Sequence, residues 1–277
     1  MDKEKRVYFH VGTGKAASTY LQYRVFPNFF GVHYIQRTRY KKALEIVQSG
    51  NHEVYLLSRE FDRQLEYEVG RFADKYPNCR PIIVLRRHDS YIASQYRRFV
   101  KNGYRKDFKS FFDVHGNTGY FKLKHLDYKR QIEVLEAKFD LPPIVLIYED
   151  LVNDPVRFVQ KLAQLLGSTI NYEQLNFERY HASYPEKQLK AILKVGRYLN
   201  LRNRKLFNNS VLQFLYRFVL AATRYSILLI AKFLPRSWFS KEPLIRLEEL
   251  NEVHAYFLDD WTFVLDYAVK STHLTED

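Results

Sequence analysis

Close to its N-terminus the chain reads Val7-Tyr-Phe-His10-Val11-Gly12-Thr13-Gly14-Lys15-Ala16-Ala17-Ser18-Thr19-Tyr-Leu21. A short run rich in β-branched and aromatic residues leads into a glycine-containing loop, and a helical pattern follows. Glycines allow such a loop to turn with its backbone N–H groups pointing inward, and Lys15, Ser18 and Thr19 add side-chain donors. The stretch therefore predicts a strand, an anion-binding loop and the start of a helix.

The loop is not a Walker A sequence. The pattern G-x-x-x-x-G-K-[ST] would require glycine in place of Phe9 and a hydroxyl residue in place of Ala16. This difference argues against an ATPase. Taken alone, the loop is better explained as an ordinary strand-to-helix turn with a solvated lysine.

Three further apolar runs read as buried strands, at residues 54–57, 82–85 and 144–148. Helical patterns separate them, with an apolar stripe from Tyr128 to Phe139 and a second helix that begins at Asp154-Pro155. Repeated strand-then-helix units predict an α/β fold: a mostly parallel, P-loop-like sheet with helices on both faces. Ligands of such folds bind at the carboxyl ends of the strands.

Composition restricts the class of protein and its partners. The 277 residues are 46% hydrophobic and 27% charged, as expected of a globular chain with a large core. The single cysteine, Cys79, excludes an internal disulfide framework and favours a reducing, cytoplasmic location, and no apolar run suits a signal peptide. A formal net charge of +13 predicts an anionic partner.

A second candidate anion site follows the third predicted strand. Arg86 stands at the end of that strand, and Ser94 lies on the helix that follows. Arginine binds phosphate through a two-pronged fork, so the two residues can converge on one anion. The alternative is that Arg86 and Arg87 are a pair of surface arginines on a solvated helix face. Two anion loops on neighbouring strands instead favour a ligand with two separated phosphate groups.

These residues resemble the sulfotransferases that use 3′-phosphoadenosine 5′-phosphosulfate (PAPS). The loop from His10 to Thr19 is similar to that family's 5′-phosphosulfate loop, K-[ST]-G-T-T, and Arg86 with Ser94 is similar to its 3′-phosphate element. The segment Tyr148-Glu149-Asp150-Leu151 resembles the family's Y-E-D-L segment before a helix. The resemblance extends over roughly residues 5 to 200, as one domain.

The resemblance implies transfer of a sulfonyl group from PAPS to an acceptor, and it implies no metal. In this reading Gly12 to Thr19 bind the 5′-phosphosulfate, Arg86 and Ser94 bind the 3′-phosphate, and Lys15 neutralises charge on the leaving oxygen. An acceptor hydroxyl needs a general base, and Glu60 after the second predicted strand is the first candidate. The alternative for Glu60 is a structural ion pair, and His10 is the second candidate for the base.

The resemblance to carbohydrate-modifying members implies a carbohydrate or glycolipid acceptor. Candidate acceptor-binding residues are His10, Arg97, Arg98 and Lys101, although a basic run is usually a solvated face. His181 and Ser183 are further candidates for contact with the donor. The acceptor's identity and the oligomeric state do not follow from the sequence, and a homodimer is one option.

The last part of the chain predicts a helical extension, residues 206–277, packed on the domain of residues 1–205. Its most apolar stretch, 211–234, is interrupted by Gln213, Arg217, Arg224 and Lys232, so we expect a helix that does not cross a membrane. It either packs on the domain or on a dimer partner, or lies on the inner face of an anionic membrane.

Two other function classes remain open from the residues alone. One is an ATP-dependent phosphotransferase that uses the same loop and would need Mg²⁺. The other is a non-catalytic protein that binds a membrane surface or other polyanions through charge alone. Nucleic acid is not expected as the partner.

Overall fold

The computed structural model describes residues 5–61, 64–175, 184–202 and 205–273. The chain forms two compact units that interleave along the sequence. We call residues 1–88, 124–180 and 257–277 the sheet unit, and residues 89–123 and 181–256 the helical unit. The predicted boundary between residues 205 and 206 stays a prediction.

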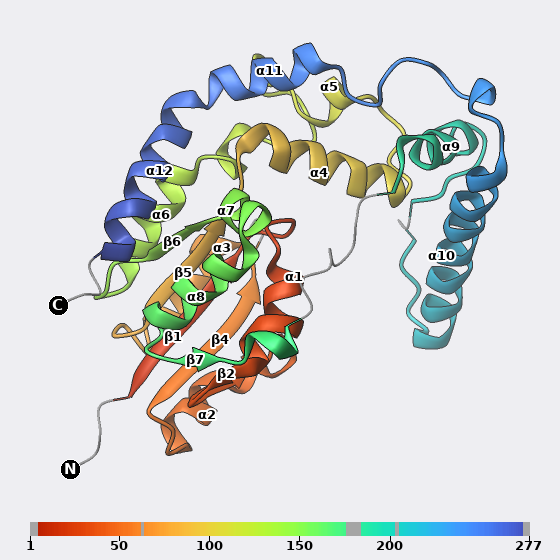
Figure 1. Ribbon diagram of the computed structural model, residues 1–277. Helices are drawn as coiled ribbons and strands as arrows, with labels where there is room; N and C mark the ends of the chain where they lie inside the picture. Colours follow the sequence, from red (N-terminus) through yellow and green to blue (C-terminus); the bar gives the residue numbers. More distant parts are fainter. Residues whose placement is uncertain (1–4, 62–63, 176–183, 203–204, 274–277) are drawn as a thin grey trace. The chain divides into compact units, whose positions relative to one another are not determined.

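The sheet unit contains a five-stranded sheet in the order β3-β4-β1-β5-β6, in which every pairing is parallel (Figure 1). The strands are β1 (Arg6–Gly12), β3 (Val32–Ile35), β4 (Val54–Glu60), β5 (Arg80–Leu85) and β6 (Ile144–Ile147). A separate antiparallel pair joins β2 (Phe29–Phe30) to β7 (Thr169–Ile170). The predicted α/β fold with a mostly parallel sheet is confirmed.

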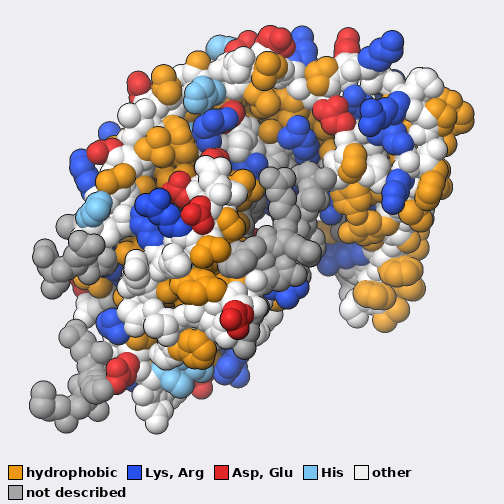
Figure 2. All heavy atoms as spheres, in the orientation of Figure 1, with side chains coloured by type: hydrophobic (Ala, Val, Ile, Leu, Met, Phe, Trp, Pro, Cys, Tyr) orange, Lys and Arg blue, Asp and Glu red, His pale blue; other side chains and the backbone are white. Residues whose placement is uncertain are grey.

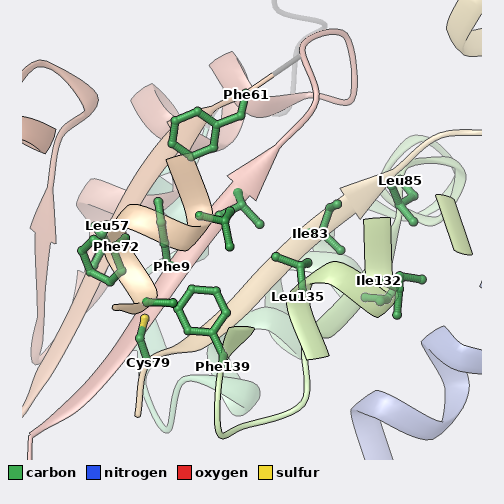
Figure 3. Packing of buried hydrophobic residues seen from close by; sticks show 14 of the residues in the cluster. Phe9, Leu57, Phe61, Phe72, Cys79, Ile83, Leu85, Ile132, Leu135 and Phe139 are labelled. Atoms are coloured by element: carbon green, nitrogen blue, oxygen red, sulfur yellow. The ribbon is translucent and has the colours of Figure 1, made fainter. Parts of the chain in front are cut away.

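Helices cover both faces of this sheet, which is why its strands read as continuous apolar runs. On one face lie α2 (Ala43–Ser49), α3 (Leu65–Ala73), α6 (Tyr128–Lys138) and α12 (Leu258–His273). On the other lie α1 (Ser18–Tyr20), the π-helical turn η1 (Leu21–Val25), α7 (Tyr148–Asn153) and α8 (Pro155–Leu165). Successive β1 residues alternate between the layers: Phe9 packs with Phe72 and Leu135 on the first face (Figure 3), and Tyr8 lies in the second layer.

Helix boundaries follow local chemistry. Asp154 caps α8 by accepting the backbone N–H of Arg157, and Pro155 occupies the first turn, as predicted. Asp127 caps α6 in the same way. These caps fix where the covering helices begin, and so which residues face the sheet.

The helical unit is built from α5 (Phe108–Phe111), α9 (Glu186–Gly196), α10 (Ser210–Phe233), α11 (Leu247–Tyr256) and most of α4 (His88–Lys101). Short turns complete the described chain: η2 (Phe26–Asn28), η3 (Arg37–Lys42), η4 (Leu123–His125), η5 (Tyr172–Gln174) and η6 (Arg236–Trp238). An aromatic cluster stabilises this unit, with the Arg202 guanidinium 5.1 Å from the ring centre of Tyr120 and 5.8 Å from those of Phe99 and Tyr104.

Candidate active site

The carboxyl end of the sheet brings Glu60 beside the predicted anion loop. Gly12, the last residue of β1, is the register partner of Glu60, the last residue of β4. The N–H of Phe61 then donates to the Gly12 carbonyl at 3.0 Å. Strand β4 thus runs three residues further than the sequence pattern predicts, and its last residue, Glu60, lies beside the start of the loop.

The loop adopts a backbone conformation that is rare for residues with side chains. Lys15 has φ 80° and Ala17 has φ 60°, both in the left-handed region. Ser18 is 1% exposed, and its hydroxyl donates to the Thr13 carbonyl at 3.1 Å. Ser18 therefore closes the loop on itself, whereas Lys15 and Thr19 are half-buried at the surface. Such strain is often retained at functional sites.

One buried hydroxyl in the loop lacks a hydrogen-bond partner among the described residues. Thr13 is 2% exposed, and its Oγ1 atom has no hydrogen-bond partner in the described part of the chain. Buried polar atoms are nearly always hydrogen-bonded, so an unpaired one calls for an explanation. An oxygen-rich ligand held by the loop would supply the missing partner.

His10 lies inside the protein beneath the loop. Its Nδ1 atom is 2.8 Å from Ser58 Oγ, which also accepts from Gln22 Nε2 at 2.9 Å. Complete burial lowers the pKa of the His10 imidazole to about 4, so the ring is neutral at pH 7. This position supports a structural role for His10; its predicted contact with substrate stays a prediction.

Arg86 contacts the predicted anion loop directly. Its Nη1 atom donates to the Lys15 carbonyl at 3.1 Å, and its guanidinium carbon lies 4.4 Å from the ring centre of Tyr148. The Tyr128 hydroxyl also donates to the Arg86 carbonyl at 2.8 Å. The structure thus brings two predicted donor-binding residues, Lys15 and Arg86, together. Tyr148 was not predicted as a site residue, although it opens the Y-E-D-L segment.

Glu149 supports the same corner of the sheet. Its Oε1 accepts the backbone N–H of Arg87 at 3.2 Å, and its buried Oε2 has no partner among the described residues. Burial raises the pKa of the Glu149 carboxyl, and the Arg87 N–H opposes that rise in part. Because Glu149 accepts the N–H of the residue that follows Arg86, it fixes the backbone that presents the Arg86 guanidinium.

The remaining predicted site residues belong to the helical unit, on α4. Ser94 is buried, and Arg97 is half-buried. Arg98 donates to Gln95 Oε1 at 3.3 Å, and the Lys101 ammonium lies within 5.8 Å of the Tyr184 and Tyr225 ring centres. The joint grip of Arg86 and Ser94 on one phosphate stays a prediction, since the two residues belong to different units. His181 and Ser183 lie outside the described residues.

A shallow surface hollow, with room for about one water molecule, opens near the end of β3, next to β4. Its lining is polar and aromatic: Gln22, Tyr23, Tyr34, Gln36, Arg37 and Thr38. Tyr34 hydrogen-bonds Ser58, and burial raises the pKa of its phenol. The hollow therefore adjoins the network of His10, Ser58 and Gln22 that lies beneath the loop.

Comparison with known proteins supplies the family of this chain. Residues 26–214 match the family model of the sulfotransferase domain, which is more than half of the chain. The chain therefore belongs to the sulfotransferase domain family and is a sulfotransferase. The match begins after the loop, so the roles of residues 12–19 rest on the residues themselves.

A solved structure shows the same fold. The sulfotransferase from Alicyclobacillus acidocaldarius matches with a TM-score of 0.50 and 16% identity, over 73% of this chain and 97% of that one. A search of curated protein sequences finds no match. Family membership favours sulfonyl transfer over the phosphotransferase and the non-catalytic alternatives.

Proposed function

We propose that the protein transfers a sulfonyl group from PAPS to a hydroxyl of a carbohydrate or glycolipid, with Glu60 as general base. The observation that carries this proposal is the meeting of three groups at one sheet edge. Glu60 is in register with Gly12 at the start of the loop, and Arg86 donates to Lys15 within the loop. A base candidate, an anion loop and a guanidinium thus lie at neighbouring strand ends.

The residues fit the donor's chemistry. A 5′-phosphosulfate is rich in oxygen acceptors, and the loop offers the unpaired hydroxyl of Thr13 together with the Lys15 ammonium. Arg86 would bind a phosphate on the adenosine side, because it is held over the Tyr148 ring next to the loop. Ser94 is the second proposed ligand of the 3′-phosphate.

The chemistry needs little beyond positioning and charge. The acceptor oxygen forms a bond to sulfur as the bond from sulfur to the 5′-phosphate oxygen breaks. Glu60 takes the acceptor's proton, which maintains a nucleophilic oxygen during attack. Lys15 neutralises the charge that grows on the departing phosphate oxygen.

The polar and aromatic surface around the shallow hollow beside β3 is the contact that we propose for a carbohydrate acceptor. Its two tyrosines, two glutamines, one arginine and one threonine offer ring faces and planar hydrogen-bonding groups, the means by which proteins hold sugar hydroxyls.

We propose a cytoplasmic site of action, since Cys79 is a buried thiol whose pKa is raised by burial, and the protein has no second cysteine.

Transfer of [³⁵S]sulfonyl from labelled PAPS to a panel of oligosaccharides and glycolipids tests the proposal. Glu60→Gln should reduce turnover by about 100- to 10,000-fold, the usual effect of losing a general base. Its affinity for adenosine 3′,5′-bisphosphate should be unchanged. Glu66→Gln, an exposed carboxylate on α3, is the matched control and should behave as wild type. Full turnover by Glu60→Gln would exclude Glu60 as the base.

A further inference from the structure

The exposed face of helix α10 is apolar, whereas a surface helix of a soluble protein exposes its polar face. Ten of the 27 exposed large hydrophobic residues in the described chain lie on this one helix. At 100° per residue these ten fall within an arc of roughly 160°, which includes Phe218, Leu229 and Phe233. Arg217 and Arg224 project from the opposite side, and Arg224 donates to the Leu201 carbonyl at 2.8 Å within the helical unit.

This apolar face is large and nearly uncovered. The helix has 24 residues, a length of about 36 Å, and only 11% of its most apolar window of 18 residues is buried. Figure 2 shows its hydrophobic side chains gathered along the right-hand edge of the view. Contiguous exposed apolar surface of this extent marks an interaction site.

Both ends of α10 carry groups suited to a lipid–water interface. Leu206 and Phe207 precede the helix, Phe233 ends it, and Trp238 follows, 59% exposed. Aromatic rings of this kind concentrate at the headgroup level of bilayers. The outward arc is thus apolar along its length and flanked by aromatic residues.

Lysines of α9 bind the carboxyl end of α10. Lys187 donates to the carbonyls of Lys232 and Leu234, each at 2.9 Å, and Lys194 donates to that of Trp238 at 3.3 Å. These bonds satisfy carbonyls that a helix end leaves without partners. They also hold cationic side chains close to the end of the apolar face.

The charge around α10 distinguishes the two partners that this apolar face could bind, a second copy of the chain and a lipid bilayer. Residues 186–246 contain thirteen lysines and arginines against two glutamates, and α10 itself has no acidic residue. A second copy of the chain would bring an equal set of cations against these, since a two-fold contact pairs like with like. An anionic bilayer instead neutralises them and accepts the apolar side chains.

We propose that α10 lies in the plane of an anionic lipid bilayer, with its outward arc buried among the acyl chains and the surrounding cations at the headgroups. Only one side of the helix is apolar and open, while the other holds Arg224 and packs against α9. A one-sided face suits a helix lying in the interface better than a spanning helix, although α10 is long enough to span. This inference depends on neither the donor nor the acceptor proposed above.

Sedimentation with lipid vesicles tests the inference. Wild-type protein should bind vesicles of phosphatidylcholine with 30% phosphatidylglycerol. Its binding to vesicles of pure phosphatidylcholine should be at least tenfold weaker. The double variant Phe218→Glu/Leu229→Glu should bind the anionic vesicles at least a hundredfold more weakly. Tyr67→Glu, an equally exposed aromatic residue on α3 of the sheet unit, should bind as wild type does.

Two further measurements fix the interpretation. Circular dichroism and adenosine 3′,5′-bisphosphate affinity should be the same in all variants, which separates loss of membrane binding from loss of the fold or of the proposed activity. Absence of wild-type binding to anionic vesicles would overturn the inference. So would a wild-type dimer in analytical ultracentrifugation that dissociates in the double variant, because the face would then cover a second copy.

Discussion

Replacing Gly12 with alanine should damage the loop by overpacking. A Cβ atom at Gly12 would lie 2.9 Å from His10 Cε1, 2.9 Å from Ser18 Oγ and 3.1 Å from His10 Nε2. Both neighbours are fully buried and hydrogen-bonded, His10 to Ser58 and Ser18 to the Thr13 carbonyl, so neither can move freely. Overpacking of this kind costs about 2 kcal/mol of unfolding free energy, or about 4 to 8 °C in Tm.

Thermal and urea unfolding followed by circular dichroism measure this loss, and Gly70→Ala is the matched control. Gly70 lies inside α3, and an added Cβ would meet only Lys138 Cε, at 3.8 Å. That substitution should stabilise the protein by about 0.5 to 1 kcal/mol, since glycine is a poor residue in a helix interior. If Gly12→Ala unfolded at the same temperature as wild type, the packing described for His10 and Ser18 would be wrong.

Three further predictions concern buried or strained groups. Burial lowers the pKa of His10 to about 4 in the folded protein, whereas the unfolded chain retains the ordinary value of 6.5. The unfolded chain therefore binds a proton first as the pH falls. Wild type should therefore lose about 3 kcal/mol between pH 6.5 and pH 4 relative to His10→Gln, and parallel urea curves for the two would refute this. Ala17→Gly should raise the free energy of unfolding by up to about 1 kcal/mol by relieving the left-handed φ of 60°, and a lower urea midpoint would show that the position is unstrained. Asp260→Ala should cost about 2 to 3 kcal/mol, because Asp260 Oδ2 lies 2.8 Å from His88 Nε2, whereas exposed Asp259→Ala should change stability by less than about 0.5 kcal/mol.

Sequence patterns predicted the framework because the sheet is buried on both faces. The apolar runs at 7–11, 54–57, 82–85 and 144–148 all became strands, although Tyr148 begins a helix. The edge strand β3 was missed, since Val32–Ile35 is short, contains His33 and is only partly buried. Strand β4 was predicted too short, because its last residues, Ser58 to Glu60, are polar and do not continue the apolar run.

Contacts between distant parts of the chain could not be read from local pattern. The Ser18 hydroxyl donates to the Thr13 carbonyl, a contact that no local pattern indicated, and its predicted contact with phosphate stays a prediction. His88 pairs with Asp260, 172 residues later, and no local signal marks that pair. By contrast, the contact between Arg86 and the loop follows from topology, since β1 and β5 are adjacent parallel strands whose ends meet.

The central claim is that this loop and Arg86 bind a sulfonyl donor through its phosphates. Calorimetric titration with adenosine 3′,5′-bisphosphate, beside 5′-AMP and ATP with Mg²⁺, tests it most directly. We predict metal-free binding of the bisphosphate that weakens about 30- to 150-fold in Arg86→Ala, with little change for 5′-AMP, as loss of a charge-assisted contact worth about 2 to 3 kcal/mol requires. Preference for ATP with Mg²⁺, or bisphosphate binding that ignores Arg86, would contradict the account.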